Sequence, residues 1–219
     1  TPFADHVVSP DALRHESLRN AIYYPGYHEL AYLHPNRFKP DPEVLRKYGV
    51  SHSERYYILR FNAFKAHHDI SEGGMSLTQK RKLVDLLIPK GKVFITTEAE
   101  LDPEFEPYKL PLPPWEMHDL LAYSQMLVSD SQTMSSEAAV LGVPAFRCNS
   151  FAGRLSVLEE EEKKYGLTFA YHPNQFNQMV DMIQQVLNDQ GALTDLQVKR
   201  RAMLADKIDV TSFWIWLIQ

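Results

Sequence analysis

The stretch VSDSQTMSSEAAVLGVPAF, residues 128–146, carries the strongest local signal in this chain. An apolar run leads into the polar letters SDSQT, a helix-forming run follows at once, and Leu-Gly-Val-Pro closes it before a second apolar run. This order predicts a strand, a helix over 132–141 and a second strand over 143–147. A strand, helix and strand in succession form the unit from which parallel sheets are built.

The start of this helix admits two interpretations. Ser, Thr and Asp are preferred helix caps, each worth ~1 kcal/mol, so Asp130 or Ser131 needs no ligand to explain it. A strand-to-helix junction also exposes unpaired backbone N–H groups and the positive end of the helix dipole, which suit a phosphate. Ser131 and Thr133 add hydroxyl donors there, and Ser129 ends the strand. Glu137 is expected on the same face as Thr133, where a carboxylate suits a ribose diol.

The bulk composition describes an ordinary globular protein, with 219 residues, 44% of them apolar and 23% charged. The chain has 23 basic and 28 acidic residues and no long basic run, which argues against a nucleic-acid partner. Cys148 is the only cysteine, so a reducing compartment, the cytoplasm, is expected. No apolar run reaches the length of a membrane span. The first residues lack a methionine and a signal-peptide core, so we expect a piece of a longer protein.

Strands and helices alternate along most of the chain. Strands are predicted over 5–9, 20–24, 55–61, 92–97, 126–129, 143–147 and near 167–170. Helices are predicted over 10–19, 43–49, 75–87, 115–124, 132–141, 154–164, 174–188 and from about 194. The proline- and aromatic-rich stretch 25–42 predicts a linker between two units. The pattern indicates an α/β fold, a Rossmann-like parallel sheet with helices on both faces, which binds ligands outside the carboxyl ends of its strands.

Several segments together resemble a known superfamily. The order strand, SDSQTMSSEAAVLGVP, strand resembles the nucleotide-sugar-binding segment in the C-terminal domain of GT-B-fold glycosyltransferases. It resembles UDP-N-acetylglucosamine 2-epimerases more closely, in which Asp-Ser, Glu-Ala and Leu-Gly-x-Pro recur in this order. LPLPPWEMHDLLAYSQMLVSDS is similar to the proline-bearing loop and short helix before the phosphate-binding turn. ADHVVSPD, YYPGYHELAYLHPNRFKPDPEVL and YYILRF resemble uncharacterised prokaryotic proteins of predicted glycosyltransferase or epimerase type.

The resemblance implies how the chain is organised. Residues 1–40 would be the end of an N-terminal domain plus the interdomain linker. Residues 41–219 would be a Rossmann-like nucleotide-sugar-binding domain of the GT-B C-terminal type. We expect its C-terminal helix to return to the N-terminal domain.

The resemblance also implies roles for individual residues. Ser131 and Thr133, with the backbone N–H groups of 131–134, would hold the diphosphate, and Glu137 would accept from the ribose hydroxyls. Main-chain groups near Met117 would read the uracil edge, and Arg60 would neutralise phosphate charge. The implied substrate-binding residues are Arg60, Met117, Ser129, Ser131, Gln132, Thr133, Glu137, Gly153 and Arg154.

At three of these positions the resemblance is less specific. Gln132 stands where related enzymes often carry a glycine that lets the backbone approach phosphate closely. Gly153 and Arg154 lie in the loop after the strand 143–147, and similar loops in the superfamily face the sugar or the acceptor.

The resemblance implies that the whole protein is a glycosyltransferase that uses a UDP-sugar as substrate, with no further cofactor and no obligatory metal. A UDP-N-acetylglucosamine 2-epimerase-like isomerase and a non-catalytic domain that retains the fold are the alternatives. The expected partners are the nucleotide-sugar and the N-terminal domain, through which any membrane contact is at most peripheral. Because the acceptor base would lie in that domain, the isolated chain should bind nucleotide weakly and catalyse nothing.

The remaining candidates are histidines. His67 and His68 follow Arg60 in a polar loop and are candidates for a general base, because histidine titrates near neutrality. The alternative for each is a solvated loop histidine. The chain has nine histidines but no His-x-x-x-His or Cys-His spacing, so no metal site is expected. The absence of Gly-x-Gly-x-x-Gly and Walker motifs argues against a dehydrogenase and a P-loop NTPase.

Overall fold

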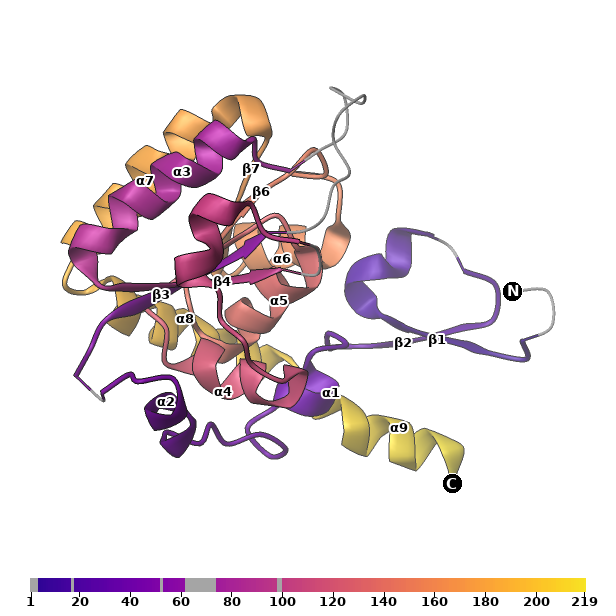
Figure 1. The fold of residues 1–219 in the computed structure, drawn as a ribbon. Coiled ribbons are helices and arrows are strands. Elements are labelled where there is room, and N and C mark those ends of the chain that lie inside the picture. The colour runs from indigo at the N-terminus through magenta and orange to yellow at the C-terminus, as the bar shows by residue number, and fades with distance from the viewer. Residues whose placement is uncertain (1–3, 17, 52, 62–73, 98–99) are drawn as a thin grey trace.

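The computed structural model describes residues 4–16, 18–51, 53–61, 74–97 and 100–219 (Figure 1). Its centre is a five-stranded parallel sheet in the order β4-β3-β5-β6-β7. The strands are β3 (Tyr56–Phe61), β4 (Lys92–Thr97), β5 (Leu127–Ser129), β6 (Ala145–Cys148) and β7 (Thr168–Tyr171). This arrangement confirms the predicted α/β fold class.

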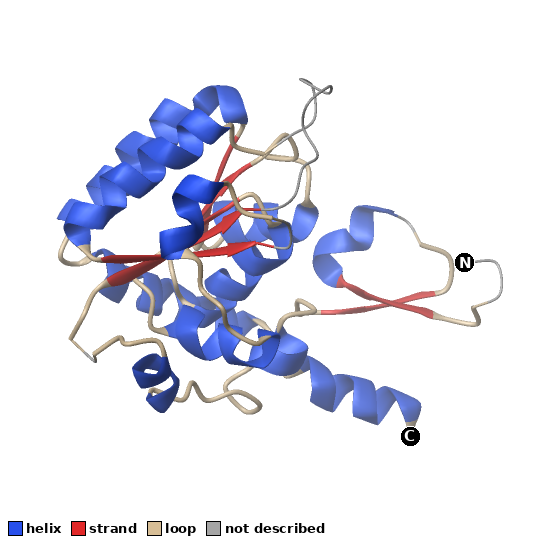
Figure 2. Cartoon of the chain, viewed as in Figure 1, coloured by secondary structure: helices blue, strands red, loops and turns tan. Residues whose placement is uncertain are grey.

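Helices connect successive strands of this sheet, as Figure 2 shows by colour. The α-helices are α1 (Leu30–Leu33), α2 (Glu43–Lys47), α3 (Leu77–Leu87), α4 (Met117–Ala122), α5 (Gln132–Leu141), α6 (Ser156–Lys163), α7 (Phe176–Asn188), α8 (Ala192–Asp206) and α9 (Val210–Ile218). Short 3-10 helices are η1 (Asp11–Glu16), η2 (Ile88–Lys90), η3 (Pro103–Tyr108), η4 (Pro114–Glu116) and η5 (Pro173–Gln175). The segment predicted as one helix over 10–19 is thus a shorter 3-10 helix.

The three inner strands, β3, β5 and β6, are buried on both faces, as expected for a parallel sheet covered by helices. Along β3, Tyr57 and Leu59 enter the core beneath α3 and α7, and Ile58 enters the opposite core beneath α4, α5 and α8. Figure 1 shows α3 and α7 together on one side of the sheet. The alternation follows from the two-residue period of a strand.

The register of the sheet brings four polar residues into one row across adjacent strands. Arg60 on β3 pairs with Thr96 on β4 and with Ser129 on β5, and Ser129 pairs with Arg147 on β6. The row lies at the carboxyl ends of the strands. The loops that follow these strands therefore meet at one edge of the sheet, where ligands bind in folds of this class.

The first forty residues begin with a separate pair of parallel strands, β1 (Val7–Pro10) and β2 (Ala21–Tyr24), which lies beside the main body (Figure 1). The stretch 25–42, predicted as a linker, packs against that body. Tyr27, Leu30 and Leu33 are at most 1% exposed and belong to the same core as α5 and α9. Proline and aromatic residues gave no clean period here, so the buried turn α1 was not predicted.

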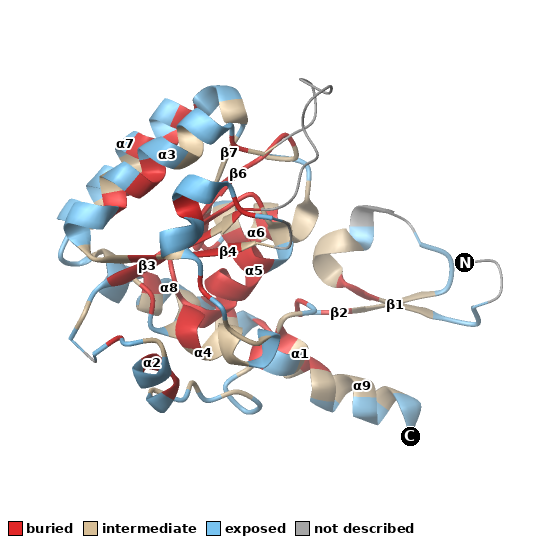
Figure 3. Ribbon diagram, viewed as in Figure 1, coloured by how far each residue is buried: buried red, intermediate tan, exposed pale blue. Residues whose placement is uncertain are grey.

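The C-terminal stretch forms two helices where one helical region was predicted from about residue 194. The break lies at 207–209, and Asp209 starts α9 by accepting a hydrogen bond from the Ser212 backbone N–H at 3.0 Å. The exposed side of α9 is visible as its blue outer end in Figure 3. Within the described ranges, no helix combines the length and the apolar character that a membrane span requires.

Candidate functional site

The turn between β5 and α5 is held by two serines. Ser131 is the N-cap of α5, and its Oγ accepts from the Met134 backbone N–H at 3.5 Å. Ser129 is fully buried, and its Oγ accepts from the Ser131 backbone N–H at 2.7 Å. The capping interpretation is confirmed for Ser131. Because helix geometry leaves the first-turn N–H groups without acceptors inside the helix, those of Gln132 and Thr133 are the ones offered to an anion.

A cavity of about 470 Å³ lies beside this helix start, at the carboxyl ends of β3 and β4. It is bounded by Arg60, Ile95, Thr96, Thr97, Lys109, Leu110, Leu112, Pro114, Met117, His118, Met134 and Glu137. Most of the wall from the β4–α4 connection is apolar. Arg60 and Lys109 supply positive charge and Glu137 supplies a carboxylate, so the larger cavity combines an apolar surface with groups suited to a phosphate and a diol.

Glu137 is 8% exposed and is held from two other elements. The Tyr32 hydroxyl, on α1, donates to its Oε1 at 2.9 Å. Nε2 of His118, on α4, lies 3.0 Å from the same oxygen. Burial, followed by the charge of Glu137, raises the pKa of the Tyr32 phenol well above its ordinary value. Tyr32 therefore stays protonated and acts as a donor.

A smaller cavity of about 240 Å³ lies on the other side of the first turn of α5. It is bounded by Leu13, His28, Glu29, Gln132, Thr133, Ser136, Arg154, Leu155, Ser156, Val157 and Leu158. Glu29 comes from the stretch 25–42, and burial raises its pKa. The start of α5 thus separates two cavities, one open to the sheet edge and one closed by the N-terminal segment.

The predicted site residues divide between these two cavities. Arg60, Met117 and Glu137 line the larger one, whereas Gln132, Thr133 and Arg154 line the smaller one, and Ser129, Ser131 and Gly153 line neither. Thr133 and Glu137 were expected on one face. Four residues advance a helix by about 400°, so the two side chains differ in direction by about 40°, and the boundary between the cavities falls between them.

Two predicted histidines cannot be placed at this site, and three residues that were not predicted contact it. His67 and His68 lie outside the described residues. Sequence reasoning missed His118 and Tyr32 as partners of Glu137, although the segments containing both were quoted for the resemblance. It also missed Asn149, whose Nδ2 donates to the Asp130 backbone carbonyl at 2.9 Å and ties the loop after β6 to the turn before α5.

Buried ionisable side chains lie behind α5, and one of them contacts Ser136, which lines the smaller cavity. Arg147 on β6 is fully buried, and within the described part of the chain its guanidinium nitrogens have no hydrogen-bond partner. Burial lowers its pKa, while the charges of Glu162, Glu159 and Glu161 act to raise it. Glu161 accepts from the Ser136 hydroxyl at 2.6 Å, and burial raises the pKa of this carboxyl. The Ser136 hydroxyl thus links α5 to the buried Glu161 carboxyl on α6.

Cys148 and possible metal ligands offer no further chemistry. Burial raises the pKa of the Cys148 thiol to about 12, so the thiolate, its reactive form, is scarce at neutral pH. Among the residues that the structure describes, no three His, Cys, Asp or Glu side chains are grouped so that they could hold a metal ion.

Comparison with known proteins gives matches only at the level of structure. No protein-family model and no curated protein matches the chain. A putative UDP-N-acetylglucosamine 2-epimerase from Listeria monocytogenes aligns with a TM-score of 0.55 at 14% identity, over 84% of this chain and 50% of that one. Os79 from O. sativa, solved with UDP and deoxynivalenol-3-glucoside, aligns with a TM-score of 0.55 at 17% identity, over 89% and 46%.

A third structure, the spinosyn rhamnosyltransferase SpnG with spinosyn aglycone, aligns with a TM-score of 0.53 at 12% identity, over 83% of this chain and 49% of that one. The chain spans about half the length of each of these three structures. Identities this low establish the fold alone. The chain has the Rossmann-like α/β fold found in GT-B glycosyltransferases and in the epimerase.

Proposed function

We propose that this chain is the nucleotide-sugar-binding half of a GT-B-type glycosyltransferase that uses a UDP-sugar. The observation that carries the proposal is the pair Arg60 and Glu137 in the wall of one cavity, beside the start of the ten-residue helix α5. A cation suits the diphosphate and a carboxylate suits the ribose diol. Their common cavity distinguishes a nucleotide site from a helix cap alone.

In this proposal the nucleotide occupies the larger cavity. Its ribose faces Glu137, and its base lies along the apolar wall formed by the β4–α4 connection and Met117. Its diphosphate lies beside Arg60 and extends toward the first turn of α5, where the backbone amides of Gln132 and Thr133, residues that line the smaller cavity, are the N-terminal donors of the helix. When the sugar leaves, negative charge develops on the diphosphate, and the helix dipole with Arg60 stabilises it electrostatically.

The proposal for the whole protein extends beyond these residues. The sugar acceptor and its base belong to an N-terminal domain, and the site forms in the cleft between the two domains. The UDP-sugar is the substrate, no further cofactor is invoked, and the single cysteine supports a cytoplasmic location. An isomerase related to UDP-N-acetylglucosamine 2-epimerase would share the same nucleotide site, because the fold is common to both.

Titration calorimetry of the 219-residue chain with UDP tests the binding proposal. We expect measurable binding, and we expect Glu137→Ala to weaken it by about tenfold, the loss of one or two hydrogen bonds to a charged group. Glu43→Ala is the control, because this exposed glutamate on α2 pairs with exposed Arg46 and lines neither cavity. No binding at millimolar UDP would favour a non-catalytic domain that retains the fold.

Product analysis of the full-length protein separates the two enzymatic readings. A transferase releases UDP only when an acceptor is present, whereas an isomerase converts the UDP-sugar without one. Turnover of a UDP-sugar by the 219 residues alone would contradict the proposal that the acceptor base lies in another domain.

A further inference from the structure

The Glu137 carboxylate is held through one oxygen by two elements that are remote from α5 in sequence. The Tyr32 hydroxyl and the His118 imidazole both reach Oε1, at 2.9 and 3.0 Å. Among the described residues, no hydrogen bond to Oε2 is found. We propose that Tyr32 and His118 are positioning residues, which fix the carboxylate so that Oε2 faces the ribose diol. This inference rests on the proposed nucleotide site.

Tyr32 is well anchored for this role. It lies on α1 between Leu30 and Leu33, which are 0% and 1% exposed. The Thr211 hydroxyl, on α9, donates to the Ala31 backbone carbonyl and ties the turn to the C-terminal helix. Tyr32 itself is 42% exposed, but the segment that carries it is packed, so the core sets the position of its backbone relative to α5.

His118 is held by aromatic packing as well as by Glu137. Its ring lies 5.5 Å from the Tyr32 ring and 6.1 Å from the Phe38 ring, measured between centroids. It stands on α4 and lines the larger cavity next to Met117. The two contacts to Oε1 therefore form a connected group, in which each ring supports the other.

The physical need for such a group follows from burial. A carboxylate that is nearly excluded from water is costly unless donors satisfy it, and a free carboxylate could rotate. The Tyr32 hydroxyl satisfies Oε1, and the two contacts at this oxygen fix the plane of the carboxyl group. A diol presented by the ribose then meets Oε2 without a loss of side-chain freedom at the moment of binding, which favours affinity.

Tyr32 could instead block the site, and this role predicts the opposite effect of its removal on UDP affinity. If the Tyr32 hydroxyl occupied the place of a ribose hydroxyl, its removal would open the site and tighten binding. Positioning predicts weaker binding and blocking predicts tighter binding, so one substitution distinguishes them. Tyr32→Phe is suitable, because it deletes the hydroxyl and keeps the ring that packs on His118.

Calorimetry with UDP and with 2′,3′-dideoxy-UDP, which lacks the diol, tests the inference. The ratio of the two affinities measures the contribution of the diol. We expect Tyr32→Phe to weaken UDP binding about five- to tenfold, the value of one hydrogen bond to a charged group, and to change dideoxy-UDP binding less than twofold. His118→Gln should also lower the ratio of UDP affinity to dideoxy-UDP affinity. In a Glu137→Gln background, Tyr32→Phe should have no further effect on UDP.

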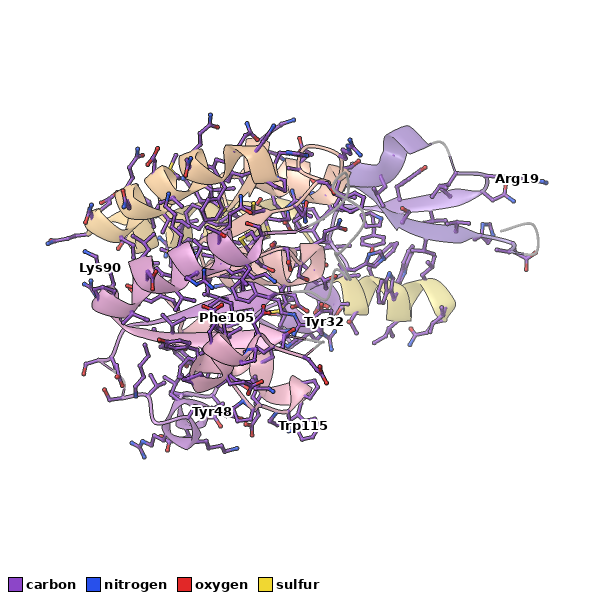
Figure 4. The ribbon with its side chains drawn as sticks, turned by 45° about the horizontal axis from the view of Figure 1, so that its top comes forward. Arg19, Tyr32, Tyr48, Lys90, Phe105 and Trp115 are labelled. Atoms are coloured by element: carbon purple, nitrogen blue, oxygen red, sulfur yellow. The ribbon has the colours of Figure 1, made fainter. Side chains whose placement is uncertain are left out.

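Tyr48→Phe is the matched control. The Tyr48 hydroxyl donates to Glu116 Oε2 at 2.6 Å, so this variant also removes a tyrosine–glutamate hydrogen bond, but in a residue that lines neither cavity. Figure 4 labels both tyrosines, which lie in separate parts of that view. The control should leave the affinity ratio unchanged.

Three results would overturn the inference while UDP binding by the wild type upholds the proposed site. These are an unchanged affinity of Tyr32→Phe for both nucleotides, an equal loss for both nucleotides, which indicates a purely structural role, and tighter binding of UDP. If the wild type binds neither nucleotide, the proposed function fails and the inference falls with it.

Discussion

Ser129 and Ser131 are joined by a hydrogen bond within the β5–α5 turn: the backbone N–H of Ser131 donates to Ser129 Oγ at 2.7 Å. The hydroxyl of a fully buried strand residue thus satisfies a backbone donor that neither the sheet nor the helix can pair. This fixes the direction in which α5 leaves the sheet. The hydroxyls of Ser129 and Ser131 at the helix start therefore have a structural role. In the proposed site, the backbone amides of Gln132 and Thr133 are the donors left for a ligand.

Ser129→Ala should lower the free energy of unfolding by about 1–3 kcal/mol, because it leaves the half-buried N–H of Ser131 without an acceptor. Ser135→Ala is the matched control. Ser135 is equally buried, but its hydroxyl donates to the Ser131 carbonyl at 2.7 Å, and a helical carbonyl also accepts from the backbone four residues on. Its loss should cost less than about 1 kcal/mol. Urea denaturation compares the two, and equal losses would contradict the role given to Ser129.

Elements with strong local signals could be predicted to the residue. The helix over 132–141 and the strand over 92–97 have the predicted bounds. Gly142 ends that helix in the left-handed conformation that the sequence Leu-Gly-Val-Pro indicates. The packing of the stretch 25–42 on the body was not predicted, because its order comes from tertiary contacts, such as the Tyr27 hydroxyl that donates to Glu160 at 3.0 Å. No window of local sequence contains both partners.

The candidate site could be predicted only in part, because some of its contacts also join residues that are remote in the sequence. Arg60 and Glu137 were predicted from their places at a strand end and in a helix, and the parallel sheet brings them to one cavity. Tyr32 and His118 join Glu137 only through the packing of α1 and α4 on α5. Their residue types are common in core and loop alike, so no local pattern indicated the contact.

Gly142→Ala should destabilise the chain more than Gly153→Ala. Both glycines have φ of +77°, so alanine costs roughly 1–2 kcal/mol at either position. At Gly142 a Cβ would also lie 2.6 Å from Arg200 Cδ and 2.6 Å from Gln197 Nε2, whereas at Gly153 the nearest atom is 4.0 Å away. Arg200 and Gln197 donate to the carbonyls of Val140 and Gly142 at the end of α5, and a shift would disturb both bonds.

We expect the difference between these two variants to be about 1 kcal/mol in urea denaturation, the value of one backbone hydrogen bond. Equal destabilisation would show that the side chains of α8 move aside freely and contribute little to the end of α5.

Lys207→Met should destabilise the packing of the N-terminal segment on the body. The Lys207 side chain is 2% exposed, and its Nζ donates to both carboxylate oxygens of Glu160 at 3.0 Å and lies 4.6 Å from the Tyr27 ring centroid. Methionine fills the space but removes the buried cation of Glu160 and leaves it only the half-exposed Lys164 at 3.7 Å, which costs about 2 kcal/mol. Lys163→Met is the control, because Lys163 is 75% exposed and its pair with Glu159 is worth at most ~1 kcal/mol.

Urea denaturation of both lysine variants checks this prediction, and raised salt should weaken the contribution of Lys163 more than that of Lys207. A Lys207→Met variant as stable as the wild type would show that the contact with Glu160 is offset by the cost of its desolvation.

Ionisation of Asp209 should make the free energy of unfolding depend on pH in the acidic range. Partial burial acts to raise its pKa, but hydrogen bonds from the Ser212 backbone and from Arg37 prevail and lower the pKa from 3.8 to about 2. A carboxyl whose pKa is lowered by folding stabilises the fold above its unfolded pKa, and this contribution is lost as the pH falls through the folded value. The window is therefore between about pH 4 and pH 2.

Asp209→Asn isolates this effect, because asparagine caps a helix as well as aspartate does but cannot carry the charge that Arg37 pairs with at 3.0 Å. At pH 6 we expect the variant to be less stable by about 1 kcal/mol, a value reduced by the partial exposure of Arg37. The difference should shrink toward zero near pH 2. Asp209→Ala should keep a loss at every pH, since it also removes the cap. Urea denaturation across this range decides the matter, and a constant difference between wild type and Asp209→Asn would contradict the role of the charge.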